Sequence, residues 1–345
     1  MSEDVSFLPL ALTMGDPAGC GPAITAEAWR QLRADPSLAF YAISAPGLYP
    51  SDLPVREIAS PEEAADVFPH ALPVLALNDV PDIQPGKPDA EAAPAIIRSI
   101  ALATSHALDG VASGIVTNPI NKALLYGAGF AYPGHTEYVA HLCADPNSSP
   151  PRPVMMLVGG GLRVALATIH IPLMTVGYAL TVPGLVQIGQ IVAASLRRDF
   201  GVAAPRIAFT GLNPHAGEDG TIGKEEISVI NPAAHALRLS GIDMSNARPG
   251  DTVFAEALGG AYDAVIAMTH DQGLIPVKTL DMWGGVNVTL GLPVVRTSPD
   301  HGTRPALPVR SQHSPPRRPC GRSGEGPCCH RSRARPRRPD ARPAR

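Results

Sequence analysis

The sequence predicts an α/β fold of two domains, in which helices cover both faces of a largely parallel sheet in an α/β/α arrangement. Short, continuous apolar runs recur along the chain, as expected for strands that are buried on both faces. Segments of helical composition separate several of these runs, which is the alternation typical of a parallel sheet. The 345 residues, of which 45% are apolar and 17% charged, are enough for two domains of a globular enzyme.

The first half of the chain begins with an apolar strand at 8–14, which runs into a turn rich in glycine and proline. The composition of 23–32 predicts a helix, and a short strand follows at 74–77. Isoleucines recur at helical spacing within 90–108, which predicts an amphipathic helix. A buried strand is predicted at 112–116.

The second half begins at Pro119-Ile120-Asn121-Lys122, which opens a helix with proline in its first turn. Further strands are predicted at 154–158, 163–168, 206–210, 264–268 and 294–296, and helices at 183–198 and 224–239. Gly159-Gly160-Gly161 separates two of these strands and is more simply a tight turn than a phosphate-binding loop. No Gly-x-Gly-x-x-Gly follows the first strand, so a nicotinamide cofactor would bind in a non-Rossmann manner, and no cofactor-binding residue is assigned.

Charge divides the chain into an acidic body and a basic C-terminal tail. The tail, residues 304–345, holds 12 arginines and nine prolines but only two acidic residues, a net charge of +10. The remaining 16 basic and 29 acidic residues give 1–303 a net charge of −13. A body this acidic argues against nucleic acid as a partner.

The tail has no helical or strand period and too little apolar surface to offset the entropy of ordering it. We therefore expect 304–345 to be a disordered, basic segment rich in proline and arginine. A nucleic-acid-binding arm is one interpretation. A change of reading frame near Arg304 explains the composition better, because a GC-rich coding sequence read out of frame yields Arg, Pro, Ala, Gly, Cys and Ser in this mixture.

The N-terminus and the cysteines indicate a cytoplasmic enzyme. Residues 1–7 are acidic where a secretory signal would be basic, and no run approaches the roughly 18 apolar residues of a membrane helix. Only Cys20 and Cys143 lie in the body, which is too few for a disulfide framework and fits a reducing compartment. We expect no membrane partner.

Each of His170, His215 and His270 comes after a predicted strand. Ligands bind at the carboxyl ends of the strands in parallel sheets. Three neutral imidazoles brought together there suit a divalent cation such as Zn, Co or Ni. Any one of these histidines is more simply a satisfied loop residue, but their shared position favours a metal site.

A second set of polar residues suits an anionic substrate. His135 and Thr136 form a compact donor pair on a glycine turn, where a helix is expected to open. Lys278, Asn287 and Arg296 lie near predicted strands or turns, and arginine can bind a phosphate or carboxylate through two hydrogen bonds. Solvated surface charge is an equal interpretation for Lys278 and for Arg296.

Two aspartates, Asp251 and Asp271, are candidate acid/base or orienting groups. Asp251 has a second interpretation as the N-cap of a helix that begins at Thr252-Val253-Phe254. Residue spacing alone indicates a metal-dependent enzyme that acts on a small anion.

Long motifs run in order through nearly all of 7–303: TMGDPAGCGP at 13–22, TNPINK at 117–122, PGHTE at 133–137, GLNPHAGE at 211–218, HDQG at 270–273, NVTLGLP at 287–293 and RTSPDHGT at 296–303. Together they resemble the 4-hydroxythreonine-4-phosphate dehydrogenase family of vitamin B6 biosynthesis. The resemblance implies an isocitrate/isopropylmalate dehydrogenase-like fold. It also implies a homodimer with a shared active site.

The resemblance implies a first domain of 1–128 plus 275–303 and a second domain of 129–274, which would carry the dimer interface. One divalent metal (Zn, Mg or Co) would be bound by His170, His215 and His270. The substrate contacts would be His135, Thr136, Lys278, Asn287 and Arg296, and the catalytic candidates are Lys278, Asp251 and Asp271.

The implied reaction is oxidation of the C3 hydroxyl of 4-phosphooxy-L-threonine by NAD or NADP. The resulting β-keto acid would lose carbon dioxide to give 3-amino-2-oxopropyl phosphate. A metal suits both steps, because it lowers the pKa of the hydroxyl to be oxidised and stabilises negative charge on the product of decarboxylation.

The sequence departs from the family pattern at three places. Thr269 stands where the family usually has Tyr, and Met174 where a basic residue is usual; we expect these two to tune the pocket. Arg304-Pro305-Ala306-Leu307 replaces the family's continuation into a closing helix. We expect this third departure to weaken cofactor binding and to expose apolar surface.

Three alternatives stay open. A sister dehydrogenase of 4-phospho-D-threonate or 4-phospho-D-erythronate shares most of these motifs, and only the amino acid substrate offers an amine to the metal. A metal-dependent phosphate-ester hydrolase with the same histidines would release phosphate without forming NADH. An inactive product of a frameshifted gene would fold through residue 303 and be catalytically silent.

Overall fold

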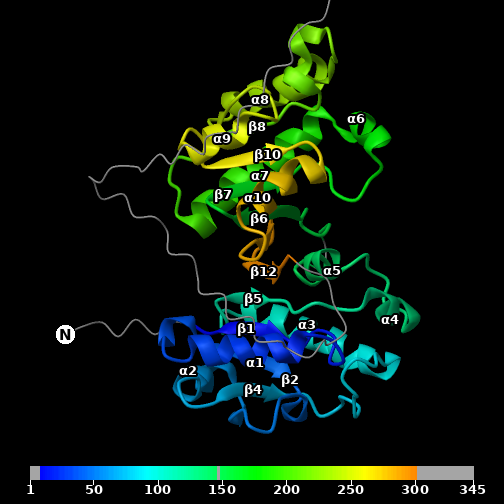
Figure 1. Ribbon diagram of the computed structural model, residues 1–345, viewed down its shortest axis with the longest axis vertical. Helices are drawn as coiled ribbons and strands as arrows, with labels where there is room; N and C mark the ends of the chain where they lie inside the picture. The colour runs from blue at the N-terminus through cyan, green and yellow to red at the C-terminus, as the bar shows by residue number, and fades with distance from the viewer. Residues whose placement is uncertain (1–7, 146–147, 301–345) are drawn as a thin grey trace, which may run out of the picture. The chain divides into compact units, whose positions relative to one another are not determined.

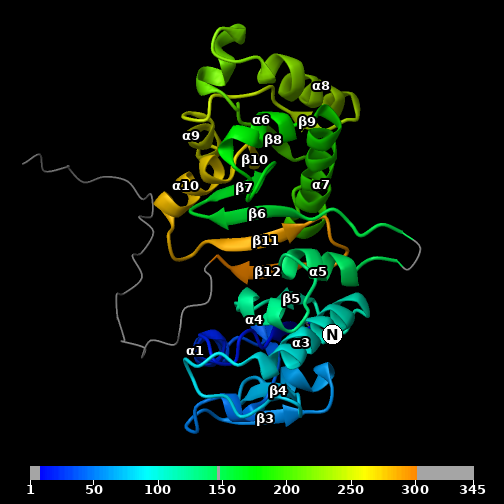
Figure 2. The ribbon, with the colours of Figure 1, turned by 90° about the vertical axis from the view of Figure 1, so that its right-hand side faces the viewer.

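The computed structural model describes residues 8–145 and 148–300, and its strands form one sheet (Figure 1). Within those ranges the sheet has twelve strands in the order β3-β4-β2-β1-β5-β12-β11-β6-β7-β10-β8-β9. The strands are β1 Leu10–Thr13, β2 Phe40–Ser44, β3 Val55–Ile58, β4 Leu72–Ala76, β5 Gly114–Val116, β6 Val154–Gly159, β7 Leu162–Leu166, β8 Arg206–Phe209, β9 Asp243–Met244, β10 Ala264–Ala267, β11 Val286–Leu290 and β12 Arg296–Pro299. Figure 2 shows β12, β11 and β6 following one another in the middle of the sheet.

Helices connect these strands. The α-helices are α1 Gly21–Leu32, α2 Ala64–Val67, α3 Ala93–Leu108, α4 Lys122–Gly127, α5 His135–Leu142, α6 Val176–Ala179, α7 Val182–Phe200, α8 Asn231–Leu239, α9 Val253–Leu258 and α10 His270–Leu280. The shorter turns are η1 Pro36–Leu38, η2 Pro46–Leu48, η3 Pro61–Glu63, η4 Ala90–Ala92, η5 Leu173–Thr175, η6 Pro214–Gly220 and η7 Glu226–Ile230.

Most neighbouring strands are parallel, as the sequence predicts; for example, Leu10 of β1 lies opposite Phe40 of β2. The antiparallel pairs lie in the middle, where β6 pairs with β7 and β11, and β11 pairs with β12. Gly160 and Gly161 join β6 to β7 at φ angles of 58° and 87°, a region that glycine adopts without strain. The glycine stretch is therefore the tight turn that was predicted.

Helices cover both faces of the first half of the sheet, because alternate strand residues point to opposite faces. On one face, Ala11 and Tyr41 pack with Ile96 of α3. On the other face, Leu12 packs with Trp29 of α1. The Trp29 indole Nε1 donates a 2.8 Å hydrogen bond to the carbonyl of Phe68, so its polar atom is satisfied in the core.

The second half repeats this arrangement with different helices. Met156 and Phe209 belong to a core that includes α7 and α8. Leu157 and Val164 lie in a separate core with α9 and with Val277 of α10. This double coverage confirms the predicted α/β class, and it fixes α10 against the strands that precede the candidate histidines.

Some local predictions were wrong. The helix expected to open at Pro119 begins at Lys122, because the Asn121 side chain accepts a hydrogen bond from the amide of Ala123 and caps the helix there. The N-cap of α9 is Thr252 and not Asp251. Strands β2, β3, β9 and β11 were not predicted.

No single helix among the described residues is long and apolar enough to cross a membrane. One pair, Leu173–Ala179 with Val182–Phe200, passes that test by length and composition alone, but it is bent by 90° and its second helix packs into the core through Leu185 and Val192. The predicted domain boundaries stay a prediction, and the tail at 304–345 lies outside the described residues.

Candidate active site

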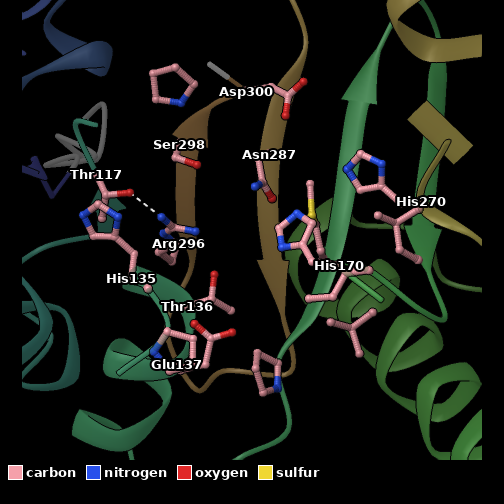
Figure 3. A pocket seen from close by; sticks show the side chains of 18 of the residues that line it. Thr117, His135, Thr136, Glu137, His170, His270, Asn287, Arg296, Ser298 and Asp300 are labelled. Carbon is pink, nitrogen blue, oxygen red and sulfur yellow. Dashed lines mark hydrogen bonds between the residues drawn. The ribbon is translucent and has the colours of Figure 1, made fainter. Parts of the chain in front are cut away.

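A cavity of about 560 Å³ lies between β5, β7, β11 and β12 and the first turns of α5 and α10. The predicted site residues that line it are His135, Thr136, His170, His270, Lys278, Asn287 and Arg296. Figure 3 shows His135 and Arg296 on one side of the cavity, His170 and His270 on the other, and Asn287 between them. Residues far apart in the sequence are thus gathered around one space of a size suited to a small ligand.

Arg296 is a buried cation in the wall of this cavity. Only 3% of the residue is exposed, so its interpretation as a solvated surface charge is wrong. Its Nη1 and Nη2 atoms donate to the hydroxyls of Thr289 (3.0 Å) and Thr117 (2.5 Å), as Figure 3 shows for Thr117. Within the described part of the chain, its Nε atom has no hydrogen-bond partner and no carboxylate forms an ion pair with it.

Burial lowers the pKa of Arg296 to about 10, and the carboxylate of Glu137 opposes this shift. The guanidinium is therefore still charged at neutral pH. A desolvated charge that contacts only hydroxyls is a strong site for an anionic ligand, because such a ligand supplies the missing counter-charge.

His135 is the first residue of α5, as expected from its glycine turn. Its Nε2 atom is enclosed and has no partner among the described residues. Burial, together with the positive charges of Arg296 and Lys122, lowers the pKa of this imidazole to about 3. His135 is therefore neutral at physiological pH.

This depressed pKa predicts a pH-dependent stability. Below pH 6.5 the His135 imidazole of the unfolded chain becomes protonated, whereas that of the folded chain stays neutral down to about pH 3. Stability that is present above pH 6.5 is thus lost as the pH falls, and we expect His135 to account for roughly 1–2 kcal/mol between pH 6.5 and 5. Urea unfolding of the wild type and of His135→Gln at both pH values checks this. Equal pH dependence of the two proteins would contradict it.

His170 and His270 follow neighbouring strands, β7 and β10, and their ring centroids are 5.5 Å apart. The Nδ1 atom of His270 lies 2.8 Å from a carboxylate oxygen of Asp271. This contact leaves Nε2 of His270 available, in the way that carboxylates orient metal-binding histidines.

His215 does not join this pair. It lines a second cavity of about 400 Å³ together with Asn213, Asp251 and Gln272. His215 follows β8, beyond β10, and its φ of 53° places it in a left-handed turn. The described residues hold no group of three His, Cys, Asp or Glu side chains close enough to bind a metal ion, so a single chain does not gather the three predicted ligands. Their role as ligands stays a prediction.

Lys278 lies two turns after His270 on α10, and its ammonium forms a 2.6 Å ion pair with Asp300. Asn287 of β11 also faces the cavity, and its Oδ1 atom is enclosed without a partner among the described residues. Asn287 thus lies between the arginine side and the histidine side of the cavity, and Lys278 lines the same cavity.

Sequence reasoning missed Thr117, Thr289, Lys122 and Asp300, although each contacts or lines the site. The signal for Asp300 was present, since Arg296, Ser298 and Asp300 alternate along an extended segment and all line the cavity. Nothing in the sequence indicates that two threonine hydroxyls hold the arginine.

Residues 32–308 match the model of a family described as pyridoxal phosphate biosynthetic protein PdxA. The chain is 51% identical over 302 residues to a 4-hydroxythreonine-4-phosphate dehydrogenase of Caulobacter vibrioides, covering 86% of this chain and 90% of that one. It is 49% identical over 311 residues to the protein of the same description in Maricaulis maris, covering 86% and 90%.

Solved structures give the same result. The structure of 4-hydroxythreonine-4-phosphate dehydrogenase from Klebsiella pneumoniae matches with a TM-score of 0.74 at 38% identity, covering 86% of this chain and 91% of that one. A terephthalate 1,2-cis-dihydrodiol dehydrogenase from Burkholderia xenovorans matches with a TM-score of 0.62 at 26% identity, covering 86% and 90%. These matches confirm the predicted fold class.

Proposed function

Because this chain belongs to the PdxA family of pyridoxal phosphate biosynthetic proteins, whose relatives are dehydrogenases, we propose that it oxidises 4-phosphooxy-L-threonine at C3 with NAD or NADP. The product would then lose carbon dioxide to give 3-amino-2-oxopropyl phosphate. The observation that carries this proposal is the buried Arg296, which forms no ion pair within the described part of the chain and lies in the same cavity as the pair His170 and His270. Such a site suits a small substrate with a phosphate at one end and an oxidisable hydroxyl at the other.

The phosphate end is assigned to Arg296, His135 and Thr136. Arg296 would supply the charge. Its Nε and the Nε2 of His135 have no partner among the residues that the structure describes, and both could bind phosphate oxygens. A neutral imidazole can donate one hydrogen bond without adding a second buried cation. Asn287, between the two ends, would bind polar groups of the substrate's carbon chain.

His170 and His270 are proposed to hold a divalent metal at the other end. Two imidazole nitrogens suit Zn or Co better than Mg, which prefers oxygen ligands. When bound, the metal would polarise the substrate hydroxyl and lower its pKa. The third imidazole, His215, lies in the other cavity of its own chain, so it would be supplied by a second copy.

An exposed apolar segment next to His170 supports the homodimer. Leu173, Met174 and Tyr178 are 75%, 88% and 91% exposed. Large apolar side chains gathered on a surface mark interfaces. A dimer formed through this segment brings a second chain close to His170, and Met174, which departs from the family's basic residue, belongs to it.

The remaining candidate residues have proposed roles in proton transfer and in orienting the metal-binding histidines. Lys278, which pairs with Asp300, would exchange a proton with the substrate, and Asp271 would orient the ring of His270. Asp251 lies beside His215 and would act at the same shared site. The nicotinamide would accept the hydride, and no residue is assigned to its binding. The free thiols of Cys20 and Cys143 fit the reducing conditions of the cytoplasm, which is the proposed location.

An absorbance assay of NAD(P)H formation with added Zn²⁺ or Co²⁺ tests the function. We expect turnover of 4-phosphooxy-L-threonine that a chelator abolishes and either metal restores. Faster turnover of 4-phospho-D-threonate would favour the sister enzyme, and phosphate release without NAD(P)H would favour a hydrolase. A version with a family-type C-terminus, assayed beside this chain, isolates the effect of 304–345, which we expect to weaken cofactor binding.

A further inference from the structure

The loop that carries His215 has a strained backbone. His215, Ala216, Gly217, Glu218 and Asp219 all have positive φ angles, between 44° and 81°. Four of these five are not glycine, and residues with side chains rarely adopt this left-handed conformation, least of all in succession. A strained segment persists only where the surrounding structure holds it in place.

Glu226 holds this loop from one side. The residue is only 2% exposed, and its Oε1 atom accepts hydrogen bonds from the backbone amides of Leu212 and Asn213, both at 2.8 Å. Its Oε2 atom accepts a third hydrogen bond from the Asn213 side chain at 2.9 Å. Successive backbone amides that converge on one carboxyl group form an anion-binding nest, which fixes the conformation of those residues.

The glycines of the loop make room for this side chain. A Cβ atom on Gly217 would lie 2.6 Å from Oε2 of Glu226, and one on Gly211 would lie 2.8 Å from the Cα of Ala216. From the other side, the Gln272 amide donates to the carbonyl of Gly211 at 2.8 Å. The entry to the His215 loop is thus fixed between Glu226 and α10, the helix that also carries His270.

We propose that Glu226 is a positioning residue that sets the direction of the His215 side chain for metal binding. Glu226 lines neither of the two cavities and would act through the backbone of Leu212 and Asn213, three and two residues before His215. Glu226 also opens the π-helical turn Glu226–Ile230, a geometry often found at functional sites. This inference rests on the proposed role of His215 as a metal ligand.

The test is Co²⁺ binding by the full-length chain, measured by titration and by the visible spectrum of the bound ion, together with amide exchange of 211–219. Glu226→Met keeps the length of the side chain but removes both acceptors. We expect its Co²⁺ affinity to fall about 10- to 100-fold and exchange in 211–219 to rise.

Glu225→Gln is the matched control, since Glu225 accepts from the Asn213 side chain but not from the amides of Leu212 and Asn213. Ile230→Val controls for lost packing on the same helix, and both controls should stay within about twofold of the wild type.

If Glu226→Met binds Co²⁺ as tightly as the wild type and its 211–219 amides exchange no faster, the proposal is overturned. If that variant does not fold, Glu226→Gln decides the matter, because it keeps one oxygen for the two amides. A loss of Co²⁺ affinity of roughly threefold to tenfold supports the proposal, and no loss overturns it. A wild-type chain that binds no Co²⁺ would refute the proposed metal site instead. In that case, amide exchange of 211–219 in Glu226→Met would decide whether Glu226 holds the loop. Exchange as slow as in the wild type would show that it does not.

Discussion

Replacing Arg296 by glutamine lowers kcat/KM for the phosphorylated substrate by about 10²- to 10⁴-fold. The guanidinium is buried, and among residues 8–145 and 148–300 it donates only to the hydroxyls of Thr117 and Thr289 and leaves its Nε without a partner. Under the proposed function, the substrate phosphate would be its counter-charge. Removing one member of a buried, hydrogen-bonded charge pair costs about 2–5 kcal/mol, and each 1.36 kcal/mol is a factor of ten in rate. Steady-state kinetics over a range of substrate concentrations measures the loss.

Two further variants separate charge from geometry. Arg296→Lys keeps the positive charge but loses the planar fork, so its loss should be smaller than that of Arg296→Gln. Thr117→Val removes one of the hydroxyls that hold Arg296, and we expect a loss of roughly tenfold. Without substrate, Arg296→Gln should unfold at the same or a higher temperature than the wild type, because an unpaired buried charge destabilises the free enzyme. An unchanged KM and kcat in Arg296→Gln would refute the phosphate assignment.

The sequence predicts the strands that carry the site because their apolar runs are short, continuous and followed by polar residues. Strands β7, β8 and β10 lie within or overlap their predicted ranges, and each of His170, His215 and His270 comes after one of them. What periodicity does not reveal is which strand ends are neighbours. His170 and His270 follow adjacent strands, whereas His215 follows a strand on the far side of β10.

Other features of the structure differ from the sequence prediction because they depend on local conformation and burial. The left-handed turn at His215 is a property of several residues in succession, held by Glu226, and no composition rule indicates it. The burial of Arg296 was equally hidden, because burial depends on β5 and β11 covering β12 from both sides. Strand β2 was missed although all five residues of FYAIS are buried.

Replacing His270 by alanine lowers kcat by at least about 10³-fold, and added metal does not restore it. His270 lies beside His170 and its ring is oriented by Asp271, so its loss removes one of the two imidazoles that a single chain brings together. A metal that activates the reacting hydroxyl contributes several kcal/mol to the rate, which sets the size of this effect. His215→Ala should be equally inactive, although His215 lies in a different cavity of the same chain.

Mixing the two inactive variants distinguishes a site built by two chains from a site built by one. If His170 and His270 of one copy act with His215 of a second copy, a dimer of one His270→Ala chain and one His215→Ala chain contains one intact site. Random exchange of subunits makes half of the dimers mixed, so the mixture should recover roughly a quarter of the wild-type activity per site. The pair His170→Ala and His270→Ala should recover nothing, because both histidines belong to the same half of the site. Recovery by that second pair, or none by the first, would show that the ligands are divided between the chains in another way.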